Sequence, residues 1–234
     1  SVNKYPDYKK LLDNIDKVVS KNNKIEIIST NPPIFTIDNF LTRKESDQPI
    51  FASGLFNGKT TGAPLTILIE NTNTKSSDYQ KTKSFHRPGH ADFVANEKFK
   101  GFQDYRGGGH FSGRLTVLIV CAGVVAKKIL NTISIKAEII EIAGESNIEK
   151  GLQKGIDNKD SVGGIVECRI KDVPTGWGEP FFDSAESVLA HAIFSIPAVR
   201  GIEFGTGFRA TKLFGSQHND TYLDKKGTTK TNHS

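Results

Sequence analysis

Two short segments of the sequence carry side chains suited to proton transfer and anion binding, and the first is RPGHAD at residues 87–92. Here a histidine lies between an arginine and an aspartate in a Pro-Gly turn. His90 could act as a general acid because a histidine titrates near neutral pH, and the planar guanidinium of Arg87 suits phosphate or carboxylate groups. An ordinary loop with a structural His–Asp contact explains the hexapeptide equally well.

The second segment is DYRGGGHFSGR at residues 104–114, directly before an apolar stretch. Three consecutive glycines expose backbone N–H groups, and a following helix N-terminus favours an anion. Arg106 and Arg114 would reinforce this preference, and His110 and Ser112 add polar contacts. The spacing matches neither a P-loop nor a dinucleotide-binding motif. The alternative is a flexible glycine turn before a helix.

A third group of polar residues lies near the end of the sequence, in GSQHND at residues 215–220 and TNHS at residues 231–234. Their neutral hydrogen-bonding groups suit a heterocycle or a ribityl chain, and they equally suit Asx turns.

Metal, serine-nucleophile and disulfide chemistry have little support. Several potential metal ligands are close in sequence: His86, His90, Asp92 and His110. They lack the spacing of a helical ligand pair, and neither an H-E-x-x-H nor a G-x-S-x-G motif is present, so we expect no metal site. We expect Cys121 and Cys168 to be reduced thiols in the core, which favours a cytoplasmic location.

The composition is that of a globular protein, with 36% hydrophobic and 24% charged residues among 234. The basic residues that give the net charge of +5 are spread along the chain. We therefore expect no nucleic-acid partner, whereas a polyanionic small substrate fits the charge. No apolar run reaches the ~18 residues of a membrane span, and no secretory leader opens the sequence, so we expect no membrane partner.

The pattern of apolar residues predicts an α+β fold, because helices and strands mix without a strict βαβ rhythm. Alternation around Asn57-Gly58 predicts a hairpin over residues 50–70. Other expected strands cover residues 25–29, 133–142 and 162–171. Expected helices cover residues 1–23, 35–41, 115–131 and 184–194, the last capped by Ser184. Residues 71–114 and 215–234 are expected to be largely loops.

Read together, these motifs resemble the chorismate synthase family. The matching blocks occur in the family's order: TRKESD at 42–47, SGLFNGKTTGAP at 53–64, RPGHAD at 87–92, DYRGGGHFSGR at 104–114, DSVGG at 160–164, GEPFFD at 178–183, SIPAVRGIEFGTGF at 195–208, GSQHND at 215–220 and KTNHS at 230–234. We therefore expect a single domain over 1–234, with a clear match over 42–234 and a poor one over 1–41.

The resemblance implies a β-α-β sandwich fold, a homotetramer and a reduced FMN cofactor, with NADPH needed indirectly to reduce the flavin. It also implies the 1,4-trans elimination of phosphate from 5-enolpyruvylshikimate 3-phosphate to give chorismate. A homologue that binds flavin or phosphate without catalysis is the alternative.

The resemblance also implies roles for individual residues. His90 would be the catalytic histidine associated with protonating the flavin, and Arg87 and Arg114 would bind substrate anions. The expected FMN contacts come from two segments: His110, Phe111 and Ser112, and then Gln217, His218 and Asn219.

The sequence departs from the family pattern in three places. A Gly-Glu-Ser-His motif expected near residues 28–31, an arginine-rich segment before Thr42 and the part after Ser234 are missing, and there is no methionine. We hypothesise that the gene encodes a complete enzyme and that this sequence is gapped, since a polypeptide this short would lack the second catalytic histidine. An intact mass near 25.7 kDa would contradict that hypothesis.

Overall fold

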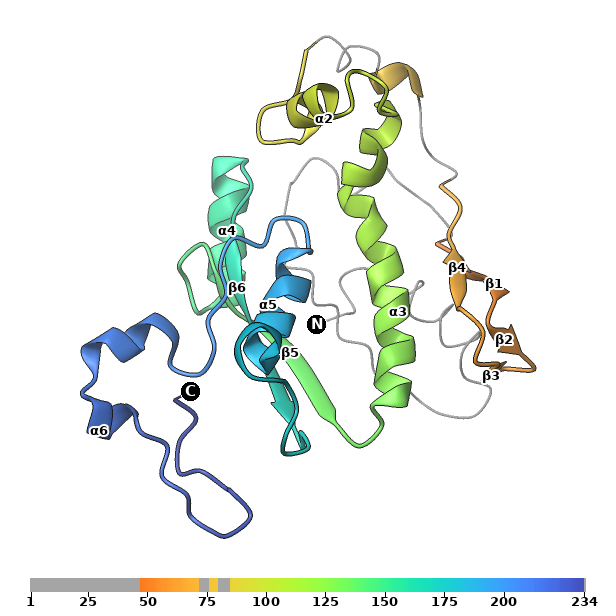
Figure 1. Ribbon diagram of the computed structural model, residues 1–234. Helices are drawn as coiled ribbons and strands as arrows, with labels where there is room; N and C mark the ends of the chain where they lie inside the picture. The colour runs from red at the N-terminus through yellow and green to blue at the C-terminus, as the bar shows by residue number, and fades with distance from the viewer. Residues whose placement is uncertain (1–46, 72–75, 80–84, 234) are drawn as a thin grey trace. The chain divides into compact units, whose positions relative to one another are not determined.

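The computed structural model describes residues 47–71, 76–79 and 85–233 (Figure 1). The elements expected over 1–23, 25–29 and 35–41 lie outside these residues. The chain forms two compact units that divide between Asp172 and Val173, and each is described by itself. A single domain over the whole chain stays a prediction.

The predicted hairpin is present at the start of the first unit. Strand β1 (Ile50–Ser53) pairs antiparallel with β4 (Thr66–Leu68), and β2 (Leu55–Phe56) pairs with β3 (Lys59–Thr60). Asn57 and Gly58 connect β2 to β3 with φ values of 49° and 73°. Two successive positive φ angles are what a two-residue hairpin turn of type I′ requires, which explains the Asn-Gly pair.

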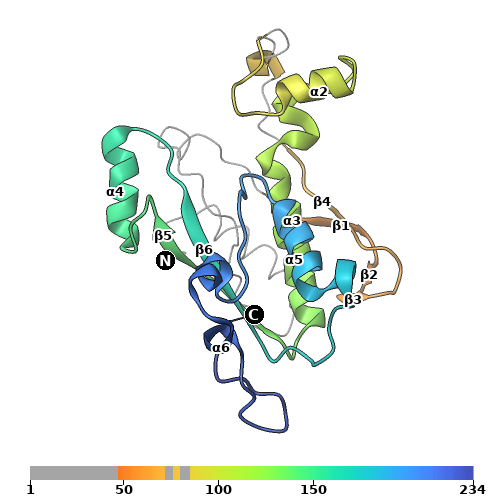
Figure 2. The ribbon, with the colours of Figure 1, turned by 60° about the vertical axis from the view of Figure 1, so that its left-hand side comes forward.

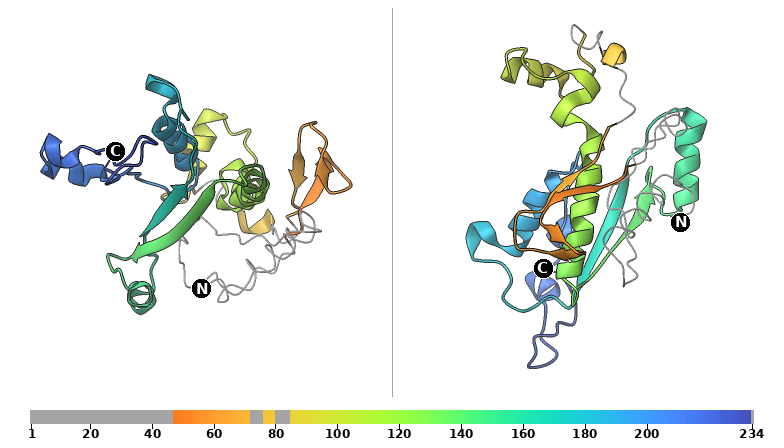
Figure 3. Two further views of the ribbon diagram at one scale, coloured as in Figure 1. Left: turned by 90° about the horizontal axis from the view of Figure 1, so that it is seen from below. Right: turned by 90° about the vertical axis from the view of Figure 1, so that its right-hand side faces the viewer.

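The apolar stretch forms helix α3 (Thr116–Ile129), which confirms the helix expected there. Its side chains Cys121 and Val124 are buried, and Val117 and two isoleucines on or beside β4, Ile67 and Ile69, pack against them. Figure 3 shows α3 lying along β4 in two further views. This contact is a hydrophobic core of the described part of the first unit.

The second predicted strand pair is also present. Strand β5 (Ser134–Ile142) runs antiparallel to β6 (Gly164–Lys171), with helix α4 (Ile148–Asn158) between them in sequence (Figure 2). We did not predict α4, because two glycines interrupt its apolar positions. One of them, Gly151, lies so close to Ile142 that a Cβ atom there would overlap the Ile142 backbone, so the helix needs this glycine to approach β5.

The cysteines are free, as expected, but only one belongs to the core. Cys121 on α3 is buried, and burial raises the pKa of its thiol to about 11. Cys168 on β6 is exposed, so the expected core position is wrong for this residue. A two-stranded sheet leaves part of each face uncovered, which a local apolar context does not reveal.

The second unit contains α5 (Ala185–Phe194) and the short helix α6 (Gly215–His218). Ser184 caps α5 as predicted, because its side chain accepts a hydrogen bond from the Ser187 N–H at 3.3 Å. Helix α6 replaces part of the loop expected after residue 215. Mixed helices and antiparallel strands make the described chain α+β. None of the helices among the described residues is long and apolar enough to cross a membrane.

Candidate active site

Three side chains of the RPGHAD segment form one hydrogen-bonded cluster. Arg87 donates from Nε to Asp92 Oδ2 at 2.7 Å and from Nη2 to Asp92 Oδ1 at 2.8 Å. Nδ1 of His90 lies 2.7 Å from the same Oδ1. Asp92 is the first residue of helix α2 (Asp92–Lys98). This helix is absent from our prediction for the region. The turn through Pro88 and Gly89 brings the other two side chains back to Asp92.

The cluster is held by charge as well as by geometry. The hydrogen bonds from the Arg87 guanidinium keep the pKa of the Asp92 carboxyl well below its usual range, and the carboxylate in turn raises the pKa of Arg87. The Asp92 side chain is 14% exposed and that of His90 is 27% exposed. The histidine therefore remains reachable while its carboxylate partner is shielded.

The glycine run lies against the histidine of this cluster. Gly107, Gly108 and Gly109 have φ values of 64°, 80° and 53°, a region that other residues rarely adopt. A Cβ atom on Gly108 would be 3.6 Å from Nε2 and Cε1 of His90. The two segments that the sequence singled out thus meet at the His90 ring.

The glycine-containing segment leads into helix α3, as expected, through short 3-10 turns that follow the glycines. After Gly109 the chain forms further 3-10 turns before α3 begins at Thr116. Ser112 caps the last of these turns, where its Oγ accepts a hydrogen bond from the Arg114 N–H at 3.3 Å. The backbone N–H groups of the glycines therefore belong to tight turns and not to the first turn of α3, and Gly108 is buried.

His110 and Phe111 form an aromatic edge beside the glycine run. Their ring centroids are 4.3 Å apart, and Phe99, just beyond α2, lies 5.4 Å from His110 and 6.3 Å from Phe111. Phe111 remains 37% exposed. A planar ligand could stack on such a surface.

The two arginines of the second segment differ in their surroundings. Arg106 binds Asp104 two residues away, and both side chains are more than half exposed, at 58% and 55%. Arg114 donates from Nη2 to Asp47 at 2.7 Å, and its side chain is only 24% exposed. Asp47 belongs to the TRKESD block, but its position beside Arg114 depends on a contact across 67 residues that no local pattern announces.

The second unit gathers the polar residues near the end of the chain. The rings of His218 and His233 have centroids 5.6 Å apart, and His233 Nδ1 lies 2.6 Å from the Thr206 hydroxyl. Asp220 accepts hydrogen bonds from the Thr231 hydroxyl at 2.6 Å and from the His233 N–H at 3.0 Å. The GSQHND and TNHS segments therefore form one cluster, as their composition suggested but could not show.

The other two expected FMN contacts lie on and beside α6. Gln217 is on the helix, and its Oε1 accepts a hydrogen bond from the Phe214 N–H at 2.9 Å. Asn219 is the residue at which the helix ends. The side-chain oxygen of Gln217 is thus used to close its own turn, which leaves the amide nitrogen as the group suited to a ligand.

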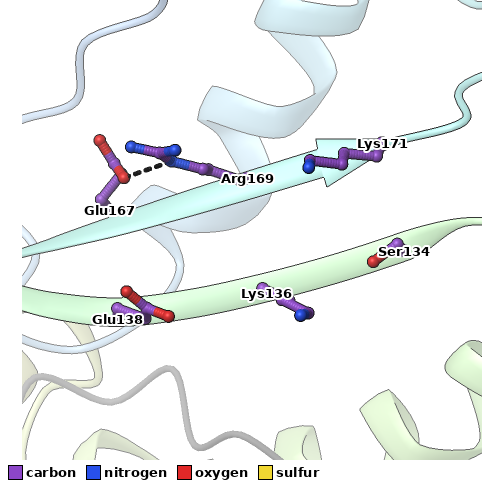
Figure 4. A pocket seen from close by; sticks show the side chains of 6 residues that line it. All are labelled: Ser134, Lys136, Glu138, Glu167, Arg169 and Lys171. Atoms are coloured by element: carbon purple, nitrogen blue, oxygen red, sulfur yellow. Dashed lines mark hydrogen bonds and ion pairs between the residues drawn. The ribbon is translucent and has the colours of Figure 1, made fainter.

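A cavity of about 300 Å³ lies elsewhere, over the charged face of the β5–β6 pair (Figure 4). It is lined by Ser134, Lys136, Glu138, Glu167, Arg169 and Lys171. These residues belong to none of the motifs above. Among the described residues, no group of three or more His, Cys, Asp or Glu side chains is arranged to hold a metal ion.

Comparison with known proteins agrees with the motifs. A model of the chorismate synthase family matches residues 39–234. The chorismate synthase of Chitinophaga pinensis is 62% identical over 192 residues, which are 82% of this chain and 58% of that protein. That of Korarchaeum cryptofilum is 44% identical over 211 residues, covering 76% of this chain and 57% of the relative. This chain thus spans a little under three fifths of the length of these two relatives.

A solved structure supports the fold. A crystal structure of a chorismate synthase superposes with a TM-score of 0.61 and 24% sequence identity, covering 80% of this chain and 64% of the other. The α+β fold of that type, predicted from the sequence, is confirmed by this likeness.

Proposed function

The chain belongs to the chorismate synthase family, and on that premise we propose that the protein eliminates phosphate from 5-enolpyruvylshikimate 3-phosphate to give chorismate. The observation that carries the proposal is that Gly108 lies beside the His90 ring, so close that a Cβ atom there would be 3.6 Å from it, which places an acid–base group next to a glycine-rich segment suited to anions. Loss of phosphate from a substrate with one phosphate and two carboxylates needs positioned cations and a proton donor, and this region contains both.

In this proposal Arg87 and Arg114 bind the substrate's anionic groups. Each guanidinium is already oriented by one carboxylate, Asp92 or Asp47. Asp92 engages Nε and Nη2 of Arg87, so Nη1 is the nitrogen that this pair leaves for a substrate oxygen. At Arg114 the substrate would share the guanidinium with Asp47. Such charge-assisted contacts fix the substrate and stabilise negative charge as phosphate leaves.

The described residues fit a flavin with a phosphate tail. The glycine turns have no side chains to block a ligand's approach to the backbone, Ser112 adds a hydroxyl, and the ring pair of His110 and Phe111 offers a planar surface. In the second unit Gln217, His218 and Asn219 present amide and imidazole groups suited to the polar edge of a flavin or its ribityl chain. When bound, reduced FMN supplies electron density to the reacting substrate and recovers it, so no net oxidation occurs. His90 would hold the proton that passes to and from the flavin during this exchange, and the elimination itself releases one substrate proton together with the phosphate.

Other features of the proposal rest on the family resemblance alone. They are the assembly into a homotetramer, a cytoplasmic location and the indirect use of NADPH to keep the flavin reduced.

An anaerobic assay of the full-length protein tests the proposal. The protein is mixed with 5-enolpyruvylshikimate 3-phosphate and chemically reduced FMN, and phosphate release is followed together with chorismate absorbance. We expect the two products in equal amounts, and no product with oxidised FMN alone. Flavin binding without turnover would contradict the proposal and indicate a homologue that only binds.

A further inference from the structure

Asp92 connects two groups of the site, yet the family motifs gave it no role of its own. We propose that Asp92 is a positioning residue that holds His90 in the tautomer with the proton on Nδ1, so that Nε2 is the atom that exchanges a proton. The tautomer follows from the geometry, and only its catalytic consequence rests on the function proposed above.

One short contact joins the side chains of His90 and Asp92. Nδ1 of His90 lies 2.7 Å from Oδ1 of Asp92, which is a hydrogen-bond distance. An ionised carboxylate can only accept hydrogen bonds, so the hydrogen between these atoms must belong to Nδ1. The bidentate contact with Arg87 keeps the pKa of Asp92 below its usual range, and the carboxylate is therefore ionised throughout the working pH range.

The carboxylate is held firmly enough to set the ring orientation. Its two oxygens accept from Nη2 and Nε of Arg87, and Oδ2 also accepts from the Arg87 backbone N–H at 3.1 Å. Asp92 is also the first residue of α2, so the helix fixes its backbone. Rotation of Asp92 away from His90 would break several bonds at once.

The remaining contacts leave Nε2 available. Nη2 of Arg87 is 3.2 Å from Nδ1 and 3.3 Å from Nε2, nearly equal distances. An atom in the ring plane could reach both nitrogens at that distance only by colliding with Cε1, so Nη2 lies over the ring face and not on the Nε2 lone pair. A Cβ atom on Gly108 would lie 3.6 Å from Nε2 and from Cε1, so the missing side chain leaves this side of the ring uncovered.

The charged groups around the His90 ring are consistent with a proton on Nδ1. Asp92 contacts its Nδ1 edge, and Arg87 covers one face, with the ring of Tyr79 6.0 Å from the Arg87 guanidinium carbon. The arginine and aspartate charges offset each other, so the carboxylate orients the histidine without leaving an unbalanced charge beside the substrate site.

Nuclear magnetic resonance of the protein with ¹⁵N-labelled histidine tests the tautomer directly. Two-bond ¹H–¹⁵N correlations at a pH above the ring's titration distinguish a protonated Nδ1 from a protonated Nε2. We expect His90 to carry its proton on Nδ1, with the signal assigned by its loss in His90→Gln. A proton on Nε2 in the unmodified protein overturns the proposal, whether or not any variant folds.

Asp92→Asn provides the second arm. An asparagine side chain can donate to Nδ1, so we expect the proton to move to Nε2 and kcat to fall by about 10² or more, with the KM for substrate changing far less. Asp104→Asn is the matched control: Asp104 also pairs with an arginine in this region but makes no contact with His90, so the His90 tautomer should stay on Nδ1.

An Asp92→Asn protein that keeps the Nδ1 proton overturns the proposal. The tautomer readout needs no turnover, so absence of chorismate formation by the unmodified protein would reject the proposed function and leave the positioning role standing.

Discussion

The two clusters of motif residues differ in the kind of interaction that holds them. Around His90 the contacts are ionic. The imidazole contacts both members of the bidentate Arg87–Asp92 pair, and the arginine lowers the pKa of the Asp92 carboxyl. Around His218 the described contacts are hydrogen bonds to a hydroxyl and to backbone groups, with Asp220 accepting from His233 and Thr231. Under the proposed function, the first cluster would carry proton transfer and anion binding, and the second would recognise the polar edge of the flavin.

The largest expected effect is at His90, the residue to which we assign proton transfer in the first cluster. His90→Ala removes the general acid–base group and should lower kcat by about 10² or more, even at saturating reduced FMN. Anaerobic phosphate release measures this. His191→Ala, a histidine on α5 outside both clusters, is the control and should keep its rate. A His90→Ala rate within threefold of the unmodified enzyme would remove this residue from the mechanism.

Arg114 should affect binding more than chemistry. Arg114→Ala removes a charge-assisted donor worth roughly 1.5–3 kcal/mol, so substrate affinity should fall about 10- to 100-fold. Isothermal titration with substrate and the bound enzyme–FMN complex measures the change. The control is Arg169→Ala on β6, an ion-paired but more exposed arginine outside the motifs. Equal substrate affinity in Arg114→Ala and in the control would contradict the anion role.

A substitution at Gly108 tests whether His90 needs a neighbour without a side chain. Gly108 has φ of 80°, a region that is unfavourable for alanine, and a Cβ atom there would lie close to Nε2 and Cε1 of His90. Gly108→Ala should therefore lower the free energy of unfolding by about 1–2 kcal/mol and, through the methyl group beside the His90 ring, also lower kcat. Gly113→Ala, where a Cβ would meet nothing within 4 Å, should change the rate little. Equal rates for the two variants would show that the close approach at Gly108 is irrelevant.

A smaller and different effect is expected in the second cluster. His218→Ala removes one neutral hydrogen-bonding group, worth about 0.5–1.5 kcal/mol, so the Kd for reduced FMN should rise roughly 2- to 10-fold. At saturating flavin kcat should recover. Anaerobic flavin titration followed by fluorescence or absorbance gives the Kd, and an unchanged Kd would exclude His218 as a flavin contact.

The smallest expected effect concerns stability and pH. The folded-state pKa of Asp92 lies below its unfolded value, so its contribution to stability is present above about pH 4 and is lost as the pH falls through the folded-state pKa. Urea unfolding should therefore show a difference between the native protein and Asp92→Asn that narrows between pH 6 and pH 3. A difference independent of pH would mean that the carboxylate charge does not contribute.

Sequence patterns predicted the elements that depend on interactions between residues close in sequence. The Asn57-Gly58 turn, the apolar helix α3 and the Ser184 cap each depend on neighbours within a few residues. Helix α4 was missed because its glycines, needed for close packing on β5, weaken the helical pattern. Helix α2 was missed because loop-forming residues surround it.

The site itself was predictable as a set of residue types but not as an arrangement. The sequence singled out His90, the glycine run and Arg114, yet it could not show that Gly108 lies beside His90 or that Asp47 pairs with Arg114. These contacts depend on tertiary folding, which no spacing within a motif encodes. The GSQHND and TNHS segments are a similar case, since Asp220 joins them through bonds that span 11 and 13 residues.

The most direct test of the division between the clusters is a cycle of His90→Ala, His218→Ala and the double variant, with kcat and the Kd for reduced FMN measured anaerobically on each. The division predicts that the loss in kcat follows His90, that the loss in affinity follows His218, and that the two effects add in the double variant. If His218→Ala lowers kcat at saturating flavin as much as His90→Ala does, the two clusters share one chemical task and the division is wrong.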